Sequence, residues 1–279
     1  GTSNVRLGVN AGDSIASGGN FNVVVGDEAG TAISTGDSNV LIGYQSGDAI
    51  TTAEQNVAVG RGTLTTNILS DANVAIGNGA LFTHNQATST DSYNVAVGDN
   101  SGAAVTTGER NTLMGGLSGD ALTDADRNTA IGFAALSTDT LGSKSTAVGS
   151  GALFTQNFTT ATDVFNTAVG FEAGLSITTG INNTLIGALA GDALTSPNNN
   201  VAVGSEALTA DTLGTTSVAI GRSTLKAQNF TTSTSTFNTA VGFVAGLSIT
   251  TGISNTLIGA HAGDALTDAD RNVALGFFA

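Results

Sequence analysis

Sixteen copies of a five-residue motif divide this chain into short repeats. The motif reads Asn, β-branched, small or aliphatic, aliphatic, Gly, as in Asn166 to Gly170. The residue number rises by 17 from one closing glycine to the next, except for a first step of 18 and steps of 21 after Gly77, Gly149 and Gly221. Three steps of 17 and one of 21 therefore make a super-repeat. A short fixed period is typical of a solenoid, in which each coil buries its apolar side against its neighbours.

We therefore predict an all-β, parallel β-solenoid of about 16 coils, with 17-residue coils and a 21-residue coil at every fourth place. We expect one repeat domain over residues 1–279. Its super-repeats cover about 27–98, 99–170 and 171–242, with a partial one over 243–279.

The positions of each repeat are numbered from its closing glycine, position 0. Position −4 is Asn in fourteen repeats and Ser in two, and stacked Asn side chains can form hydrogen bonds along a ladder. Positions −3 and −1 are Thr or aliphatic and share one face of a strand, because side chains alternate. We expect that face to lie inside the coil. Position −2, mostly Ala or Leu, would then face outward.

An outward row of apolar residues would form an unusually long exposed patch on a single chain. A strand that is apolar on both faces is usually covered on both faces. We therefore predict that this row is a subunit interface. Its residues are Leu41, Ala58, Ala75, Ala96, Leu113, Ala130, Ala147, Ala168, Leu185, Ala202, Ala219, Ala240, Leu257 and Ala274.

The other half of each coil comes in two types. Position +4 reads Gly, Gly, Leu, Leu through each super-repeat. The glycine type has an aliphatic residue at position +7, for example Ile177 after Gly174. We interpret these segments as a second short strand in each coil, followed by a polar turn such as 178–180.

The 21-residue coils insert four residues and produce the segments 84–93, 156–165 and 228–237. Insertions in repeat proteins form loops on one face, which is often the binding face. Two interpretations stay open: the rings in these segments contact a ligand, or they fill the bulge or seal a subunit seam. The candidate surface-binding residues are His84, Tyr93, Phe158, Phe165, Phe230 and Phe237.

Composition excludes several classes of partner and chemistry. There are no cysteines, so disulfides and thiolate metal sites are excluded. The net charge is −14, which argues against nucleic acid and anionic membranes as partners. The sequence contains no apolar run long enough to predict membrane insertion. The chain starts without Met and stops inside a repeat, so we expect a fragment or a processed product.

Few residues suit catalysis or metal binding, and we predict no enzyme, no cofactor and no metal. The two histidines, His84 and His261, occupy unrelated positions, which favours a surface or seam role for each. A polysaccharide-cleaving enzyme would need two carboxylates in a groove, whereas the acids here are scattered over turns.

Two acidic turns resemble the start of a calcium loop. They begin at Asp124 and Asp268, but Thr129 and Val273 occupy the place of the required glycine, and the closing Glu is missing. We interpret both as solvated turns. Four aspartates recur once in every super-repeat and could form cation- or water-holding rings in a three-fold assembly: Asp48, Asp120, Asp192 and Asp264.

The repeats Asn73 to Gly77 and Ser217 to Gly221 resemble the head repeats of trimeric autotransporter adhesins of the YadA-like type. The stretch Asn166 to Gly187 also resembles repeats of phage tail fibres. The resemblance covers essentially the whole chain. It implies a left-handed β-roll, a parallel homotrimer, an extracellular location on a cell surface or virion, and a binding or stalk role.

The function that we expect is a rigid structural or adhesive fibre segment, with a host surface protein or glycan as a possible target. One alternative is a filament of subunits added end to end, since neither terminus looks like a cap. Another is a protein that binds ice or a polysaccharide surface. An ice binder would want regular outward threonines, which the outward Ala and Leu of the expected arrangement do not supply.

Overall fold

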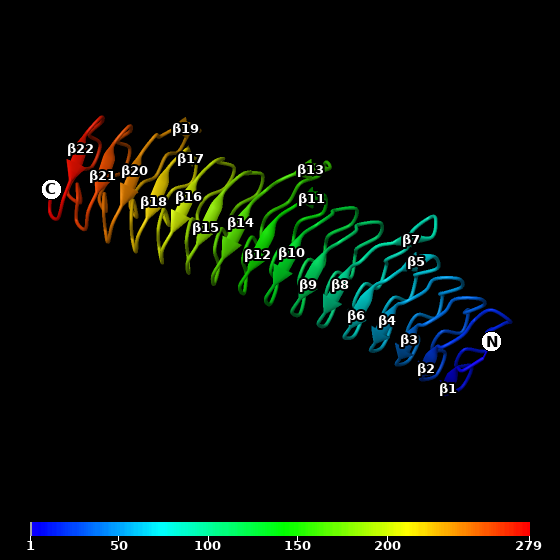
Figure 1. Ribbon diagram of the computed structural model, residues 1–279. Helices are drawn as coiled ribbons and strands as arrows, with labels where there is room; N and C mark the ends of the chain where they lie inside the picture. Colours follow the sequence, from blue (N-terminus) through cyan, green and yellow to red (C-terminus); the bar gives the residue numbers. More distant parts are fainter. Residues whose placement is uncertain (1) are drawn as a thin grey trace. The chain divides into compact units, whose positions relative to one another are not determined.

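The computed structural model describes residues 2–279 (Figure 1). The chain is an all-β parallel β-solenoid of about 16 coils, as the repeat period predicts. It divides into two compact units of the same construction. One comprises Gly1–Ser143 with Thr159–Ala161, and the other comprises Lys144–Phe158 with Thr162–Ala279.

Each coil contributes one three-residue main strand, which corresponds to positions −3 to −1 of the repeat. The main strands of the first unit are β1 (Val5–Leu7), β2 (Val23–Val25), β3 (Val40–Ile42), β4 (Val57–Val59), β6 (Val74–Ile76), β8 (Val95–Val97), β9 (Thr112–Met114) and β10 (Thr129–Ile131). Those of the second unit are β12 (Thr146–Val148), β14 (Thr167–Val169), β15 (Thr184–Ile186), β16 (Val201–Val203), β18 (Val218–Ile220), β20 (Thr239–Val241), β21 (Thr256–Ile258) and β22 (Val273–Leu275).

Two-residue strands occur only beside the wide coils of the described chain. They are β5 (Ser70–Asp71), β7 (Thr90–Asp91), β11 (Gly142–Ser143), β13 (Thr162–Asp163), β17 (Gly214–Thr215) and β19 (Thr234–Ser235).

Main strands within a unit pair in parallel, and equal repeat positions face each other. Val57 pairs with Val74, and Ala58 pairs with Ala75. The pairing keeps this register across the wide coil, where Ala75 pairs with Ala96. The extra residues of a wide coil therefore bulge elsewhere and leave the main sheet undisturbed.

The expected assignment of the strand faces is wrong. Position −2 faces the inside of the coil: Ala58 and Leu185 are fully buried within the single chain, whereas Ile186 at position −1 is 39% exposed. A three-residue strand points only its middle side chain inward. The interface predicted from position −2 is therefore wrong. Thirteen of its residues are fully buried in the core: Leu41, Ala58, Ala75, Ala96, Leu113, Ala130, Ala147, Ala168, Leu185, Ala202, Ala219, Ala240 and Leu257. Ala274, in the last coil, is half-buried at the same inward position.

The core is filled by large and small side chains that alternate between positions −2 and +4: a leucine at one position lies against glycine or alanine at the other. Leu185 extends over Gly174 and Gly191: a Cβ on either glycine would lie 2.8 Å from a methyl carbon of Leu185. Where position +4 is a buried leucine, as at Leu208, position −2 is Ala202. Dense packing without overlap requires this alternation, because protein interiors tolerate neither voids nor added methylenes. The alternation explains the order Gly, Gly, Leu, Leu.

The prediction of a second strand in each coil is also wrong. The segment after the corner glycine is a run of tight turns, in which positions +2 and +4 adopt the left-handed conformation. Even the buried leucines follow this path, with φ of 51° at Leu153 and 54° at Leu208. Hydrogen bonds to the next coil hold these turns, as where Leu153 N–H donates to Ala173 O at 3.1 Å. These bonds offset the strain that a left-handed leucine carries.

The asparagine ladder at position −4 is confirmed. The backbone N–H of Asn39 donates to Oδ1 of Asn22 at 2.9 Å, and Asn56 N–H donates to Asn39 Oδ1 at 3.0 Å. Each amide also spans its own coil, as where Asn39 Nδ2 donates to Ala53 O at 2.9 Å. These asparagines are fully buried. The ladder thus ties the start of the main strand to the facing wall and to the next coil.

The corner glycines form a column that no other residue can occupy without distortion. Gly187 has φ of +134°, and a Cβ on it would lie 2.6 Å from the carbonyl carbon of Gly204 in the next coil. We expect Gly187→Ala to lower the free energy of unfolding by at least about 2 kcal/mol, because both the backbone angle and the stacking distance oppose a side chain. Urea unfolding followed by circular dichroism measures this.

Gly116→Ala is the matched control. A Cβ there meets nothing closer than 3.7 Å, so stability should stay unchanged or rise by up to about 1 kcal/mol. Equal losses in the two variants would contradict the stacking argument.

Candidate functional site

The reversed strand faces create an outward sheet face, defined as the first and third residues of the main strands. It consists of Val and Thr at the first position and of Val, Ile, Leu or Met at the third. Ile42, Met114, Ile186 and Ile258 are among its exposed side chains. Neighbouring rungs of a sheet lie about 4.8 Å apart, so each unit presents one regular aliphatic column and one column of Val and Thr.

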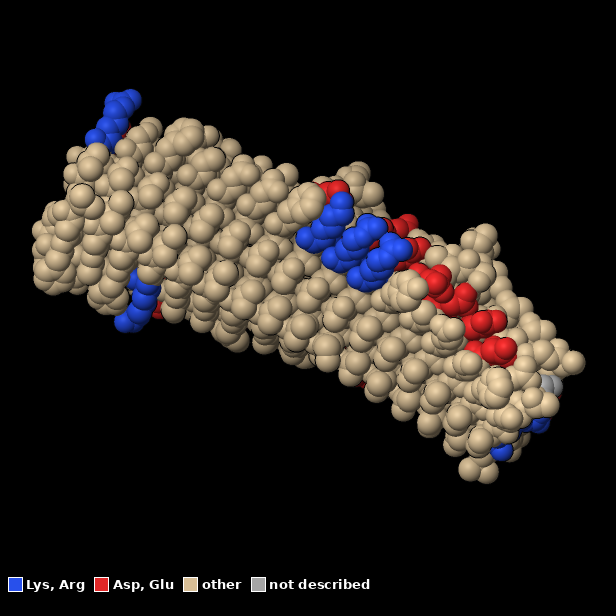
Figure 2. Space-filling view, viewed as in Figure 1, with Lys and Arg blue, Asp and Glu red and all other residues tan. Residues whose placement is uncertain are grey.

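The outward sheet face carries no charged residue in any of its strands. Most acidic and basic side chains lie instead in turns or in the two-residue strands. The side of the molecule shown in Figure 2 is largely uncharged, and most of the charges visible there lie along one edge. A surface without charged side chains is unusual for a chain with a net charge of −14. It is broad, flat and apolar, which is typical of a surface that contacts another regular surface.

The wide coils enclose buried polar clusters at position +7. In the first super-repeat, His84 Nε2 lies 2.7 Å from Ser70 Oγ, which lies 2.6 Å from Ser92 Oγ. In the third, Gln228 Nε2 donates to Asp211 Oδ2 at 2.5 Å, and Asn238 Nδ2 donates to Gln228 Oε1 at 2.8 Å. Burial lowers the pKa of His84 to about 4 and raises the pKa of the Asp211 carboxyl.

Three of the six loop candidates are interior residues. His84 is fully buried, and Phe158 and Phe230 are more than 90% buried, so a surface-binding role for these three is wrong. The surface or seam role expected for His84 is wrong for the same reason. The two phenylalanines fill the bulge of their wide coils. Tyr93, Phe165 and Phe237 are exposed and stay candidates for surface contact.

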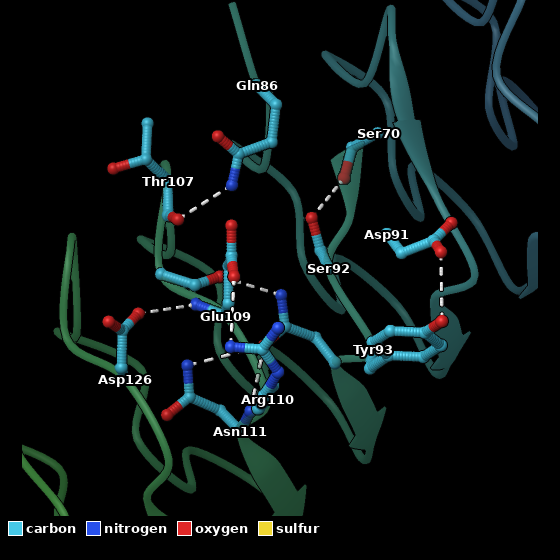
Figure 3. A network of polar contacts seen from close by, with 12 residues as sticks. Ser70, Gln86, Asp91, Ser92, Tyr93, Thr107, Glu109, Arg110, Asn111 and Asp126 are labelled. Carbon is cyan, nitrogen blue, oxygen red and sulfur yellow. Dashed lines mark hydrogen bonds and ion pairs between the residues drawn. The ribbon is translucent and has the colours of Figure 1, made fainter. Parts of the chain in front are cut away.

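The exposed rings end the inserted segments, and two of them, Tyr93 and Phe165, lie beside charged side chains. Tyr93 Oη donates to Asp91 Oδ2 at 2.9 Å, a hydrogen bond that raises the pKa of the tyrosine (Figure 3). Lys144 Nζ lies 2.5 Å from Asp163 Oδ2 and 5.3 Å from the centre of the Phe165 ring. The Lys144–Asp163 pair thus ties the segment 156–165 to the coil before it, whereas the Tyr93–Asp91 bond lies within its own segment.

The acidic turns serve as hydrogen-bond acceptors between coils. Asp124 Oδ1 accepts from Thr106 Oγ1 at 2.6 Å and from Thr107 Oγ1 at 2.7 Å, and the bond from Thr106 is the main cause of its lowered pKa. Asp126 Oδ1 accepts from Glu109 N–H at 2.8 Å (Figure 3). Within residues 2–279, no three His, Cys, Asp or Glu side chains converge in a way that could hold a metal ion.

The aspartates that recur once in every super-repeat differ in their surroundings. Asp120 accepts from Ser137 Oγ at 2.6 Å, Asp192 accepts from Thr209 Oγ1 at 2.5 Å, and Asp264 Oδ2 lies 2.9 Å from His261 Nδ1. Burial raises the pKa of Asp48. The rings proposed for these aspartates concern an assembly of chains and stay a prediction.

Sequence reasoning missed the interior role of position +7. A signal was present: where position +4 is Leu, position +7 is polar. The six residues in question are Asn67, His84, Asp139, Gln156, Asp211 and Gln228, and all are fully buried.

Family models, curated proteins and solved structures offer no match to this chain. In the described part of the chain, no helix is long and apolar enough to cross a membrane. The function must therefore be argued from the geometry above.

His84 predicts a pH dependence of stability. The pKa of His84 is about 4 in the folded chain and 6.5 ordinarily. Between pH 6.5 and 4, the imidazole is therefore protonated in the unfolded chain and neutral in the folded chain. Stability should fall as the pH drops from 6.5 to about 4, by up to about 3 kcal/mol. His84→Gln should remove this loss, since Gln156 and Gln228 occupy the same position in the other wide coils.

Unfolding free energies of both proteins at several pH values between 4 and 7.5 measure the effect. His261→Gln, which removes the other histidine, provides the control: the effect of His84→Gln at each pH should be the same with and without it. A difference between original and His84→Gln chains that does not change with pH would contradict the burial of a neutral His84.

Proposed function

We propose that this chain is a rigid structural and adhesive segment of an extracellular fibre, built from three copies that associate through the outward sheet face. The observation that carries the proposal is this apolar, charge-free and regular face on an otherwise acidic chain. The number of copies follows from the resemblance of the repeats to adhesin heads and tail fibres. The cell-surface or virion location rests on the same resemblance.

Charge favours a second copy of this chain as the occupant of the face. Two chains of net charge −14 repel each other through most of their surfaces. The outward sheet face brings no like charges together, and its columns repeat at the same spacing in every copy. Self-association through this face therefore meets the least electrostatic resistance.

The area of the face limits the contact that it can make. Eight rungs at about 4.8 Å and three residues at about 3.3 Å give each unit a flat area of about 400 Å². This is about half of what one partner contributes to a standard interface, and in a trimer it is shared between two neighbours. Coils stacked in register supply the stiffness that a stalk needs, because each coil bonds to its neighbours along its whole path.

A second candidate is an ice-surface binder, which one observation favours. The outward sheet face includes threonines on successive rungs, such as Thr146, Thr167 and Thr184. The sequence-based argument against such a ladder assumed that position −2 faced outward, and the buried position −2 removes that objection.

The association is tested by native mass spectrometry of the intact chain, which should report a trimer. In the double variant Ile186→Lys, Ile220→Lys, each interface would bury unpaired ammonium groups. We expect association to weaken at least about a hundredfold, to a monomer at micromolar concentration. Circular dichroism should stay unchanged, because both isoleucines are outward.

Phe171→Lys is the control, since this exposed ring lies in a turn outside the face. It should leave the trimer intact. A monomeric original chain, or a double variant that stays trimeric, would overturn the proposed interface.

The two candidates give opposite results in a freezing assay. A face buried between copies cannot contact ice, so the fibre segment predicts no thermal hysteresis. A monomer that shapes ice crystals and depresses freezing would favour the second candidate over the first.

A further inference from the structure

We propose that a hollow in the first super-repeat binds one sugar residue that bears a carboxylate, such as a hexuronic acid. The hollow has a volume of about 210 Å³ and is lined by Gln45, Arg61, Gly62, Asn78, Gly79, Phe82 and Asn100. All of these residues belong to the first unit. The proposal rests on the adhesive role proposed above and gives it a ligand; it can fail while the structural role stands.

The hollow exists because two successive coils lack a side chain at position +2. Gly62 and Gly79 both occupy this position, with φ of +61° and +65°. Most other coils carry a side chain there, for example Gln45 and Asn100 on either side. The missing side chain of Gly62 opens a depression between coils, and the amide of Asn100 extends over Gly79 at its edge.

In the second and third super-repeats, a residue with a side chain replaces at least one of these two glycines. In the third, Glu206 and Ser223 replace the two glycines, and Glu206 Oε2 accepts from Lys226 Nζ at 2.6 Å and from Ser223 Oγ at 3.1 Å. In the second, Ala134 replaces Gly62, whereas Gly151 keeps the glycine that corresponds to Gly79. Two successive glycines at position +2 therefore occur only in the first super-repeat.

An aromatic ring forms one wall. A Cβ on Gly62 would lie 3.6 Å from Phe82 Cε2, so the ring lies directly beside the space over that glycine. Phe82 is 43% exposed. Binding pockets commonly combine such an apolar surface with a few placed polar groups, and the apolar C–H face of a pyranose fits a ring of this kind.

The amide groups are held in place by Asp99. Asn78 Nδ2 donates to Asp99 Oδ1 at 2.9 Å, and Asn100 Nδ2 donates to Asp99 Oδ2 at 3.0 Å. Asn100 Oδ1 is therefore turned away from Asp99, and a Cβ on Gly79 would lie 2.5 Å from it. This carbonyl oxygen is an acceptor at the edge of the hollow, suited to a sugar hydroxyl.

Arg61 supplies the charge that selects a carboxylate. Among the described residues, its guanidinium forms no ion pair, although the chain carries 22 acids and 8 bases. The two acids that bond to lining residues are already engaged: Asp99 accepts from the amides of Asn78 and Asn100, and Glu28 Oε2 accepts from Gln45 Nε2 at 2.8 Å. A guanidinium with free donors binds a carboxylate through two parallel hydrogen bonds.

The test is a titration of the full chain with glucuronate and, separately, with glucose, followed by ligand-observed NMR. We expect glucuronate to bind and glucose to bind at least about tenfold more weakly, the loss of one charge-assisted contact. Arg61→Gln should weaken glucuronate binding by a similar factor. Gly62→Asn should abolish it, because the new side chain fills the hollow and Asn tolerates the left-handed conformation, as Asn100 does.

Arg222→Gln is the matched control, because Arg222 is also at position +1 but lies near Phe243 in the second unit. It should bind glucuronate like the original chain. No binding of glucuronate at millimolar concentration, or equal binding by a folded Gly62→Asn chain, would overturn the site. Equal binding of glucose and glucuronate would overturn the role of Arg61. Native mass of the same samples reports the fibre proposal independently.

Discussion

The constraint on which this structure depends is the repeat distance between coils. Each backbone turn must meet the next at hydrogen-bond distance, and any side chain that interferes is excluded. The corner glycines show this most directly, since a Cβ on Gly149 would lie 2.2 Å from the carbonyl oxygen of Gly170. The buried asparagines stabilise the same repeat distance by hydrogen bonds between coils: Asn183 N–H and Asn183 Nδ2 both donate to Asn166 Oδ1 in the coil before. The repeat period follows from these contacts.

The fold was predictable from sequence because these requirements fall on single residue types. Only glycine adopts the corner angle without strain. The recurrence of Asn at position −4, as at Asn166 and Asn183, predicts a hydrogen-bonded ladder. The strand faces were not predictable by the same means. Both faces of Thr184–Ile186 carry an aliphatic side chain, so alternation alone leaves two acceptable assignments of the inward face. What decides between them is the fit of Leu185 over Gly174 and Gly191, a relation between coils.

The candidate site was predicted less well, for a related reason. Polar or aromatic character suggested that His84, Phe158 and Phe230 lay on the surface, but a wide coil needs buried groups to fill and bond its enlarged interior. Buried polar groups there bond to one another, as where Asn238 Nδ2 donates to Gln228 Oε1 at 2.8 Å. The exposed Tyr93 differs because it ends its inserted segment in a left-handed turn whose side chain points outward.

A backbone that is the same in every coil leaves function to the positions that the stacking does not constrain. Position +2 is one of them: it is left-handed throughout, yet it accepts Gly62, Asn100, Leu117, Glu206 or His261. Where two neighbours are glycine, a hollow opens; where they are Glu206 and Ser223, the side chains bond to each other and close it. Variation in such a solenoid therefore changes the surface without changing the fold. Binding sites should be sought where one super-repeat departs from the other two.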